Sequence, residues 1–178
     1  MNTEAIQDGI GYIGWLKSTG VWYSHQFTTR GLIYDVLDLL LADEKGRQIP
    51  LGYIGNRLVR ILRAAKSFYG HSGYQGVLRG AIKVTGVKGD TVLPVSTQGS
   101  ILDTRTQALL NEYEWLLELD TSILSDPKLL GDFFVEKMKE IYWSFGYNDW
   151  SFNEGRVRKL AEDQNLIPKS TNSGQAAT

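Results

Sequence analysis

The sequence predicts an α+β fold in which helices pack on one face of a small antiparallel sheet of about three strands. Two patterns lead to this prediction. Apolar residues recur at helical spacing over residues 32–41, 50–69 and 125–146, whereas over residues 77–120 they alternate with polar residues as in strands. Helices are therefore expected before and after one block of strands.

A first helix is expected after Thr28 and Thr29, whose hydroxyl groups suit an N-cap. Its apolar positions follow helical spacing; they are Leu32, Ile33, Val36, Leu37, Leu40 and Leu41. The polar turn at residues 43–47 ends this helix, and Pro50 opens a second helix that runs to about Tyr69.

The second helix is amphipathic. One arc of its helical wheel holds only apolar side chains, namely Ile54, Leu58, Ile61, Leu62, Ala65 and Phe68. Arg60, Arg63 and Lys66 fall on the opposite side. This helix is expected to pack on the core, to present a basic face to solvent, and to end at the glycines of residues 70–73.

Three strands are expected in the middle of the chain. Residues 77–87 and 91–95 are predicted to form a hairpin across the turn at 86–90. Pro94 has no amide hydrogen and therefore places the second of these strands at an edge. The third strand, residues 112–119, has the clearest alternation, with one face formed by Tyr113, Trp115, Leu117 and Leu119. 

The C-terminal third is predicted to be helical. One helix begins at Ser125-Asp126-Pro127 and runs to Gly146, and a shorter one spans residues 154–164. Trp115, the largest side chain on its strand face, is expected to be buried near Phe133 or Phe134. Residues 1–167 are predicted to form a single domain, and the polar residues 168–178 a disordered tail.

Composition restricts the function. The 178 residues are 42% hydrophobic and 22% charged, and they include no cysteine, which excludes disulfide scaffolds, thiolate zinc sites and thiol nucleophiles. Neither a signal peptide nor a membrane-spanning run is recognisable. We expect a cytoplasmic protein with no membrane partner, and no cofactor is predicted.

Basic residues are concentrated in one region. Seven of them lie between Arg57 and Lys88, where no acidic residue occurs, although the net charge of the chain is -1. Such a region can bind an anion, or it can be neutralised by internal pairing. The helical positions Arg57, Arg60, Arg63 and Lys66 are the candidate nucleic-acid contacts.

The acidic face of residues 112–119 also allows two interpretations. Glu112, Glu114 and Glu118 are predicted to pair across the sheet with Arg79 and Lys83. Alternatively they could hold a metal ion in a hydrolase or nuclease. No histidine joins them, and we assign no metal ligand.

Other motifs are weak. Residues 9–14 have the letters G-x-G-x-x-G, but no strand is expected before them, so they are predicted to be a flexible or helix-breaking lead-in rather than a dinucleotide site. Residues 43–45 have the D-x-K letters of metal-dependent nucleases, yet they fall in a predicted turn. His25 and His71 lack a recognisable nucleophile partner. No catalytic residue is predicted.

Aromatic residues near the chain ends form a second candidate site. Trp15, Trp22, Tyr23 and Trp150 lie in segments of poor periodicity with glycine and polar neighbours. Large rings in such segments can line a pocket or an interface between protomers. We therefore expect a homo-oligomer, or a pocket closed by these rings.

One region resembles a known family. Residues 57–74, residues 82–89 and the sequence Trp-Ser-Phe-Gly at 143–146 are similar to the region that accompanies AlbA-type (Schlafen-like) DNA-binding domains in bacterial proteins. The resemblance covers about half of the chain, which lacks a recognisable AlbA-type domain itself. It implies an accessory binding or assembly module, with DNA binding carried over only weakly.

These observations favour a non-enzymatic binding module. Its expected partners are a second copy of the chain, another protein, or nucleic acid contacted by the basic helix. The alternative is the metal-dependent hydrolase or nuclease that would use the strand carboxylates.

Overall fold

The computed structural model describes residues 2–6, 9–16, 21–28, 33–37, 41–43, 46–95 and 105–169. Before residue 46 the description covers the backbone and, of the side chains, those of Gln26 and Ile33.

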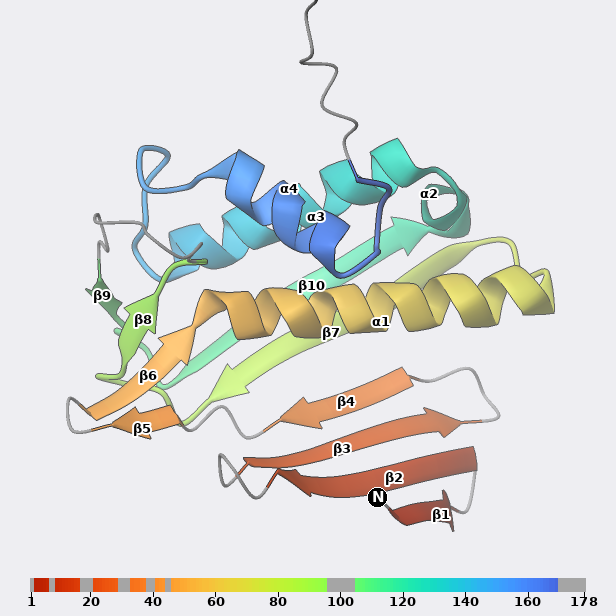
Figure 1. Ribbon diagram of the computed structural model, residues 1–178, viewed down its shortest axis with the longest axis horizontal. Coiled ribbons are helices and arrows are strands. Elements are labelled where there is room, and N and C mark those ends of the chain that lie inside the picture. Colours follow the sequence, from red (N-terminus) through yellow and green to blue (C-terminus); the bar gives the residue numbers. More distant parts are fainter. Residues whose placement is uncertain are drawn as a thin grey trace, which may run out of the picture.

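The described residues form ten strands and four helices (Figure 1). The strands are β1 (Asn2–Ile6), β2 (Gly9–Leu16), β3 (Val21–Thr28), β4 (Ile33–Leu37), β5 (Leu41–Asp43), β6 (Gly46–Pro50), β7 (Val77–Thr85), β8 (Thr91–Leu93), β9 (Thr106–Gln107) and β10 (Glu112–Asp120). The helices are α1 (Leu51–Ser72), α2 (Thr121–Ser125), α3 (Pro127–Ser144) and α4 (Glu154–Asp163).

The strands belong to three sheets. β1 to β4 form an antiparallel sheet in chain order, β7 pairs antiparallel with β10, and β5, β6, β8 and β9 form a mixed sheet. Helix α1 contacts β4 on one side and α3 and α4 on another, so it lies in the middle of the fold (Figure 1). The predicted α+β class is confirmed.

The helix predicted over residues 32–41 is wrong. Residues 33–37 form β4, which pairs antiparallel with β3, and Leu41 begins β5. Leu32 and Leu40 lie outside the described residues. The segment Ile-Tyr-Asp-Val-Leu is rich in β-branched and aromatic residues, and strand pairing with β3 overrides its weak helical spacing.

The predicted helix over residues 50–69 is confirmed as α1. It follows Pro50 and ends at Gly73, which has the positive φ of 67° that glycine adopts without steric penalty. Of its predicted inward face, Ile54, Leu58, Leu62 and Ala65 are buried, Ile61 is half-buried, and Phe68 is an exception. Phe68 is 39% exposed, and its ring packs edge-on against Tyr69 at 5.1 Å between centroids.

The two-stranded sheet has one buried face. Tyr113, Trp115, Leu117 and Leu119 of β10 are buried, and the residues between them are exposed, as the alternation predicts. Trp115 lies opposite Ile82, and its Nε1 donates a hydrogen bond to Ser144 Oγ at 2.8 Å. Helices therefore cover a single face of this sheet.

The expected burial of Trp115 is confirmed, but its expected neighbours are not the ones observed. Among the described residues its ring contacts are with Phe145 and Tyr113, at centroid distances of 5.8 and 5.9 Å, instead of Phe133 or Phe134. The ring reaches the C-terminal end of α3 because β10 runs beside that helix (Figure 1).

The hairpin predicted between residues 77–87 and 91–95 is wrong. β8 does not pair with β7; it lies between β6 and β9, so it is an inner strand, and Pro94 follows its last residue. The turn at 86–90 is tied elsewhere, because Gly89 N donates to the Ala108 carbonyl and Arg47 forms an ion pair of 3.0 Å with Asp90.

Helices α3 and α4 occur where they are predicted. Asp126 caps α3 by accepting hydrogen bonds from the amides of Lys128 and Leu129, and Asn153 caps α4. The short helix α2 was not predicted. Residues 170–178, within the tail predicted to be disordered, lie outside the described residues.

Two tyrosines attach the end of β8 to the α3 region. The Tyr142 hydroxyl accepts a hydrogen bond of 2.6 Å from the Val95 amide, and the Tyr147 hydroxyl donates to the Val92 carbonyl at 2.9 Å. Burial raises the pKa of Tyr142 to about 12. The neutral phenol is thus the form that the fold stabilises.

Replacing Trp115 by alanine is expected to lower the free energy of unfolding by about 3–5 kcal/mol, because a buried aromatic ring and its packing contacts are lost. Trp150, which is 98% exposed, provides the matched control. Trp150→Ala should change stability by less than about 0.5 kcal/mol in the same urea titration. Similar losses for both variants would contradict the assignment of the buried face.

Two glycines of α1 test how closely the helices approach. A Cβ atom at Gly55 would lie 2.8 Å from Leu160 Cδ2 and 3.2 Å from Met138 Cε, whereas one at Gly52 would meet nothing within 4 Å. Gly52→Ala is expected to stabilise α1 by up to about 1 kcal/mol through helix propensity. Gly55→Ala should be less stable than Gly52→Ala by about 1–3 kcal/mol because of overpacking, measured by thermal unfolding. Equal stabilities would show that α4 does not press on α1 here.

Candidate functional site

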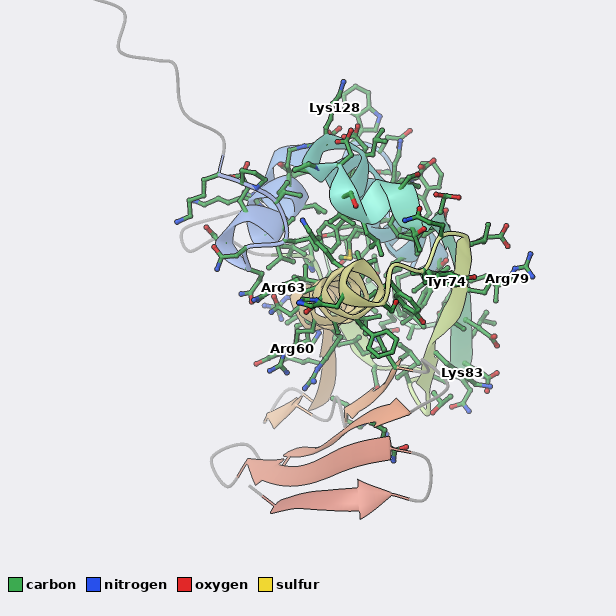
Figure 2. The ribbon with its side chains drawn as sticks, turned by 90° about the vertical axis from the view of Figure 1, so that its right-hand side faces the viewer. Arg60, Arg63, Tyr74, Arg79, Lys83 and Lys128 are labelled. Atoms are coloured by element: carbon green, nitrogen blue, oxygen red, sulfur yellow. The ribbon has the colours of Figure 1, made fainter. Side chains whose placement is uncertain are left out.

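The candidate basic face is carried by α1. Arg60, Arg63 and Lys66 are exposed. At about 100° per residue, Arg60 and Arg63 lie away from the buried Leu58 and Leu62, whereas Lys66 lies on the flank that carries Gly55 and Val59. They lie on one side of the molecule, where Figure 2 shows Arg60 and Arg63 projecting from α1 seen end-on. The helix contains no acidic residue from end to end.

The four predicted contact residues differ in their surroundings. Arg57 is half-buried and interacts with other groups of the chain, so it is not an open contact. Arg63 donates a hydrogen bond of 3.1 Å from Nη1 to the Gln164 carbonyl. Arg60 and Lys66 form no hydrogen bond or ion pair with the rest of the described chain. The open part of the predicted face is therefore Arg60, Arg63 and Lys66, which we call the α1 strip.

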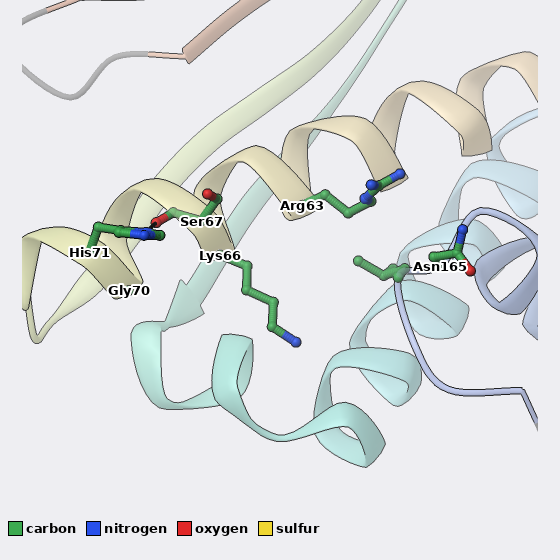
Figure 3. Close-up of a pocket in the computed structure, with 7 residues that line it drawn as sticks. Arg63, Lys66, Ser67, Gly70, His71 and Asn165 are labelled. Carbon is green, nitrogen blue, oxygen red and sulfur yellow. Dashed lines mark hydrogen bonds between the residues drawn. The ribbon is translucent and has the colours of Figure 1, made fainter.

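A groove lies beside one end of the α1 strip. Its volume is about 520 Å³, and α1 forms one wall while the turn after α4 forms the other (Figure 3). Its lining residues are Arg63, Lys66, Ser67, Gly70, His71, Asn165 and Leu166. Figure 3 shows Lys66 extending from α1 into the space between the helix and the turn that holds Asn165. No carboxylate is among these lining residues.

The groove exists because α1 is longer than its neighbour. Helix α4 lies beside α1 from the Gly55–Leu160 approach to the Arg63–Gln164 hydrogen bond, and then it ends. Beyond that point α1 still contacts α2, but the side that α4 covered earlier is open and forms the groove. The groove therefore begins where α4 ends.

The turn after α4 is well fixed. Asn165 has a positive φ of 54°, and its amide donates to the Glu162 carbonyl at 3.0 Å. The Leu166 amide donates to the Ala161 carbonyl at 2.9 Å, and the Leu166 side chain is buried. The polar side chain of Asn165 is therefore held at the groove by a turn that is anchored on both sides.

His71 forms the far end of the groove. Its Nδ1 donates a hydrogen bond of 2.6 Å to the Ser67 carbonyl, one helical turn earlier. This bond fixes the ring on the last turn of α1 and leaves Nε2 as the ring nitrogen that can meet a ligand.

Opposing charges act on this groove. The C-terminal ends of α1 and α4 both lie beside it, and each helix end carries about half a negative charge. Arg63 and Lys66 contribute two full positive charges. The lining itself is therefore positive, although the last turn of α4 places the carboxylates of Glu162 and Asp163 next to Gln164, outside that lining.

The basic residues of β7 are neutralised, as predicted from the sequence. Arg79 Nε lies 3.1 Å from Glu118 Oε2, and Lys83 Nζ lies 2.7 Å from Glu112 Oε1. The hydrogen bond to Glu112, together with the charges of Glu112 and Glu114, raises the pKa of Lys83. Both pairs lie on the exposed face of the β7–β10 sheet.

The fold separates the basic region of the sequence into two parts. Figure 2 shows Arg60 and Arg63 on one side of the molecule and Arg79 and Lys83 on the opposite side. A single surface formed by all seven basic residues is thus excluded. Among the described residues of this region, the cations without a carboxylate partner are those of the α1 strip and the exposed Lys88 in the turn after β7.

The alternative metal site gains no support from these contacts. Glu112 and Glu118 each face a cation rather than each other. Within the described residues, no three histidine, aspartate or glutamate side chains come together as they would around a metal ion.

The aromatic candidates are separated as well. Trp150 is 98% exposed, in a turn held by hydrogen bonds between Asn148 and Ser151, and it does not line the groove. Trp15 and Trp22 are opposite each other in the β2–β3 ladder, and Tyr23 is opposite Gly14. The side chains of these three residues lie outside the described part of the structure, so the predicted interface is not tested.

Two weak motifs take on a definite structure. The G-x-G-x-x-G letters at residues 9–14 lie within β2, which corrects the expected flexible or helix-breaking lead-in. A dinucleotide fingerprint needs a turn between a strand and a helix, so this one is excluded. Asp43 is the last residue of β5, and Glu44 and Lys45 lie outside the described residues.

The groove was missed from the sequence. Ser67, Gly70 and Asn165 carry no motif, and Asn165 is almost a hundred positions from Lys66 in the chain. The one signal in the sequence was that two amphipathic helices, α1 and α4, each end in a short polar segment.

No model of a protein family, curated protein or solved structure matches this chain. Among the described residues, no helix is both long enough and apolar enough to cross a bilayer.

The Arg79–Glu118 pair can be tested by a double-mutant cycle. Arg79→Ala, Glu118→Ala and the double variant are expected to give a coupling energy of about 0.2–1 kcal/mol, because both side chains are exposed. The coupling should fall at 1 M salt. A zero coupling energy at low salt would show that Arg79 is not paired and remains available to a ligand.

Proposed function

We propose that this protein is a non-enzymatic binding module that holds nucleic acid through the α1 strip. Arg60, Arg63 and Lys66 contact phosphates of the backbone, and no base is read by these three side chains. Binding therefore has little sequence preference, since phosphate contacts carry no base information.

The observation that carries this proposal is the unequal neutralisation of the two basic regions. On β7, Arg79 and Lys83 each have a carboxylate partner within 3.1 Å. On α1, Arg60 and Lys66 have no partner among the described residues. Arg63 donates a hydrogen bond to the neutral carbonyl of Gln164, which does not compensate its charge. Uncompensated cations at neighbouring turns of one helix favour a polyanion as ligand.

The resemblance to the region that accompanies AlbA-type DNA-binding domains points in the same direction. It suggests a module that assists binding or assembly next to nucleic acid. The lack of cysteine fits a reducing compartment such as the cytoplasm.

Three cations support only modest affinity. Each neutralised phosphate contributes about -0.9 to the slope of log affinity against log salt concentration. A slope of about -3 is therefore the largest that one α1 strip can give. Tight binding at physiological salt requires several strips, and so we also propose that the protein acts as a homo-oligomer.

The test is a salt titration of binding to a short duplex by fluorescence anisotropy. The variant Arg60→Ala/Arg63→Ala/Lys66→Ala is expected to lose most of the affinity and most of the slope. The matched control is Arg79→Ala/Lys83→Ala/Lys128→Ala, which removes the same charge from other faces of the molecule (Figure 2). The control should keep the wild-type slope.

Two results would contradict the proposal. One is no detectable binding of wild type at 50 mM salt. The other is an equal loss of affinity in both triple variants, because that would mean that net charge, not the α1 strip, governs binding. Thermal unfolding of each variant checks that the fold is retained.

A further inference from the structure

We infer that the groove at the end of α4 is a binding pocket for a phosphate monoester, either the terminal phosphate of a nucleic-acid strand or that of a free nucleotide. The inference rests on the proposed function in one respect, because Arg63 and Lys66 belong to both sites. The pocket itself is defined by its walls, its charge and its size.

The walls of the groove favour the end of a nucleic-acid strand over its middle. Helix α4 and its anchored turn at residues 164–166 close the groove on one side, and the Arg63–Gln164 hydrogen bond joins that turn to α1. A nucleic-acid strand that contacts Arg60 and Arg63 therefore meets this turn beyond Arg63, so that the phosphate reaching Lys66 is the last one of the strand. A chain that terminates in the groove meets Lys66 and His71 instead.

The donors suit a terminal phosphate. A monoester carries about -1.5 to -2 charges near neutral pH and presents three oxygen acceptors, whereas an internal phosphodiester carries a single charge. Lys66 offers three N–H donors, and the Arg63 guanidinium retains donors beyond the one bonded to Gln164. Ser67 and Asn165 add neutral donors to the same lining. Two cations and no carboxylate in the lining favour the more highly charged group.

The volume sets the size of the ligand. At about 520 Å³ the groove is far larger than a phosphate group and lies within the range of small-molecule sites. The backbone of Gly70, which has no side chain, and the edge of the largely buried Leu166 are the apolar parts of the lining next to the cations. A phosphate with its attached sugar and base is therefore a better match than inorganic phosphate alone.

A purely structural role of the same residues makes a different prediction. Cations beside helix C-termini stabilise those helices, so Lys66 could act on stability without touching a ligand. Under that role, Lys66→Gln lowers the midpoint of thermal unfolding but has no influence on which end group is preferred. The ratio of affinities for two end groups separates the two roles.

The experiment compares three single-stranded oligonucleotides of one sequence with an internal fluorophore, bearing no terminal phosphate, a 5′-phosphate or a 3′-phosphate. Wild type is expected to bind one of the phosphorylated strands about tenfold more tightly than the unphosphorylated strand, as for a charge-assisted contact. Lys66→Gln should abolish this ratio. Arg60→Gln, which lies outside the groove, should weaken binding to all three strands and keep the ratio.

Adenosine monophosphate and adenosine form the second arm, and competition by the nucleotide alone identifies a free nucleotide as a ligand. If the strands bind wild type equally and the nucleotide does not compete, the pocket is refuted while the proposed function stands. If no strand binds but the nucleotide raises the unfolding temperature of wild type and not of Lys66→Gln, the pocket stands and the proposed function fails. A ratio that persists in Lys66→Gln would overturn the pocket.

Discussion

The burial of one flank of α1 is the constraint on which the rest of this structure depends. Leu58, Val59 and Leu62 are almost fully removed from solvent, and Gly55 allows Leu160 and Met138 to approach the helix backbone. Burying three such side chains contributes several kcal/mol, far more than any exposed ion pair in the molecule. The rotation of α1 about its axis is therefore set by apolar packing. The polar residues take the directions that this packing leaves to them.

The position of the candidate site follows from that rotation. With Leu58 and Leu62 inward, Arg60 points outward, Arg63 meets the turn after α4, and Lys66 lies on the flank of α1 just beyond the end of α4. The groove then results from a difference in length, since α1 continues for about two and a half turns beyond its contact with Gln164. Arg63 is held by its hydrogen bond to Gln164, whereas Lys66 forms no interaction with the described chain that places it. A site of this kind can arise from the core alone and be tuned by single surface substitutions.

Part of this arrangement could be predicted from the sequence, and the division has physical reasons. The buried faces of α1 and β10 could be predicted because burial repeats at a fixed period along each element. The Glu112–Lys83 and Glu118–Arg79 pairs followed from strand alternation. The strand at residues 33–37 could not be predicted, because its apolar spacing also fits a helix and the outcome depends on pairing with β3. The same is true of β8, whose partners β6 and β9 are non-local. The groove joins positions that only the packing of α4 on α1 brings together, and no local pattern encodes that.

The net charge of -1 does not argue against a local anion site. At physiological salt the screening length is about 8 Å, and Arg63 lies between Arg60 and Lys66, only about 4.5 Å from each along a helix axis that rises ~1.5 Å per residue. They consequently act on a ligand as one group. The carboxylates of β10 lie on the far side of the molecule from Arg60 and Arg63 (Figure 2), beyond a helix whose diameter alone is about 10 Å. Those carboxylates are also engaged with Arg79 and Lys83, so their residual field at α1 is small. A near-neutral protein can thus present a positive site, provided that its acidic groups are paired locally and kept more than one screening length away.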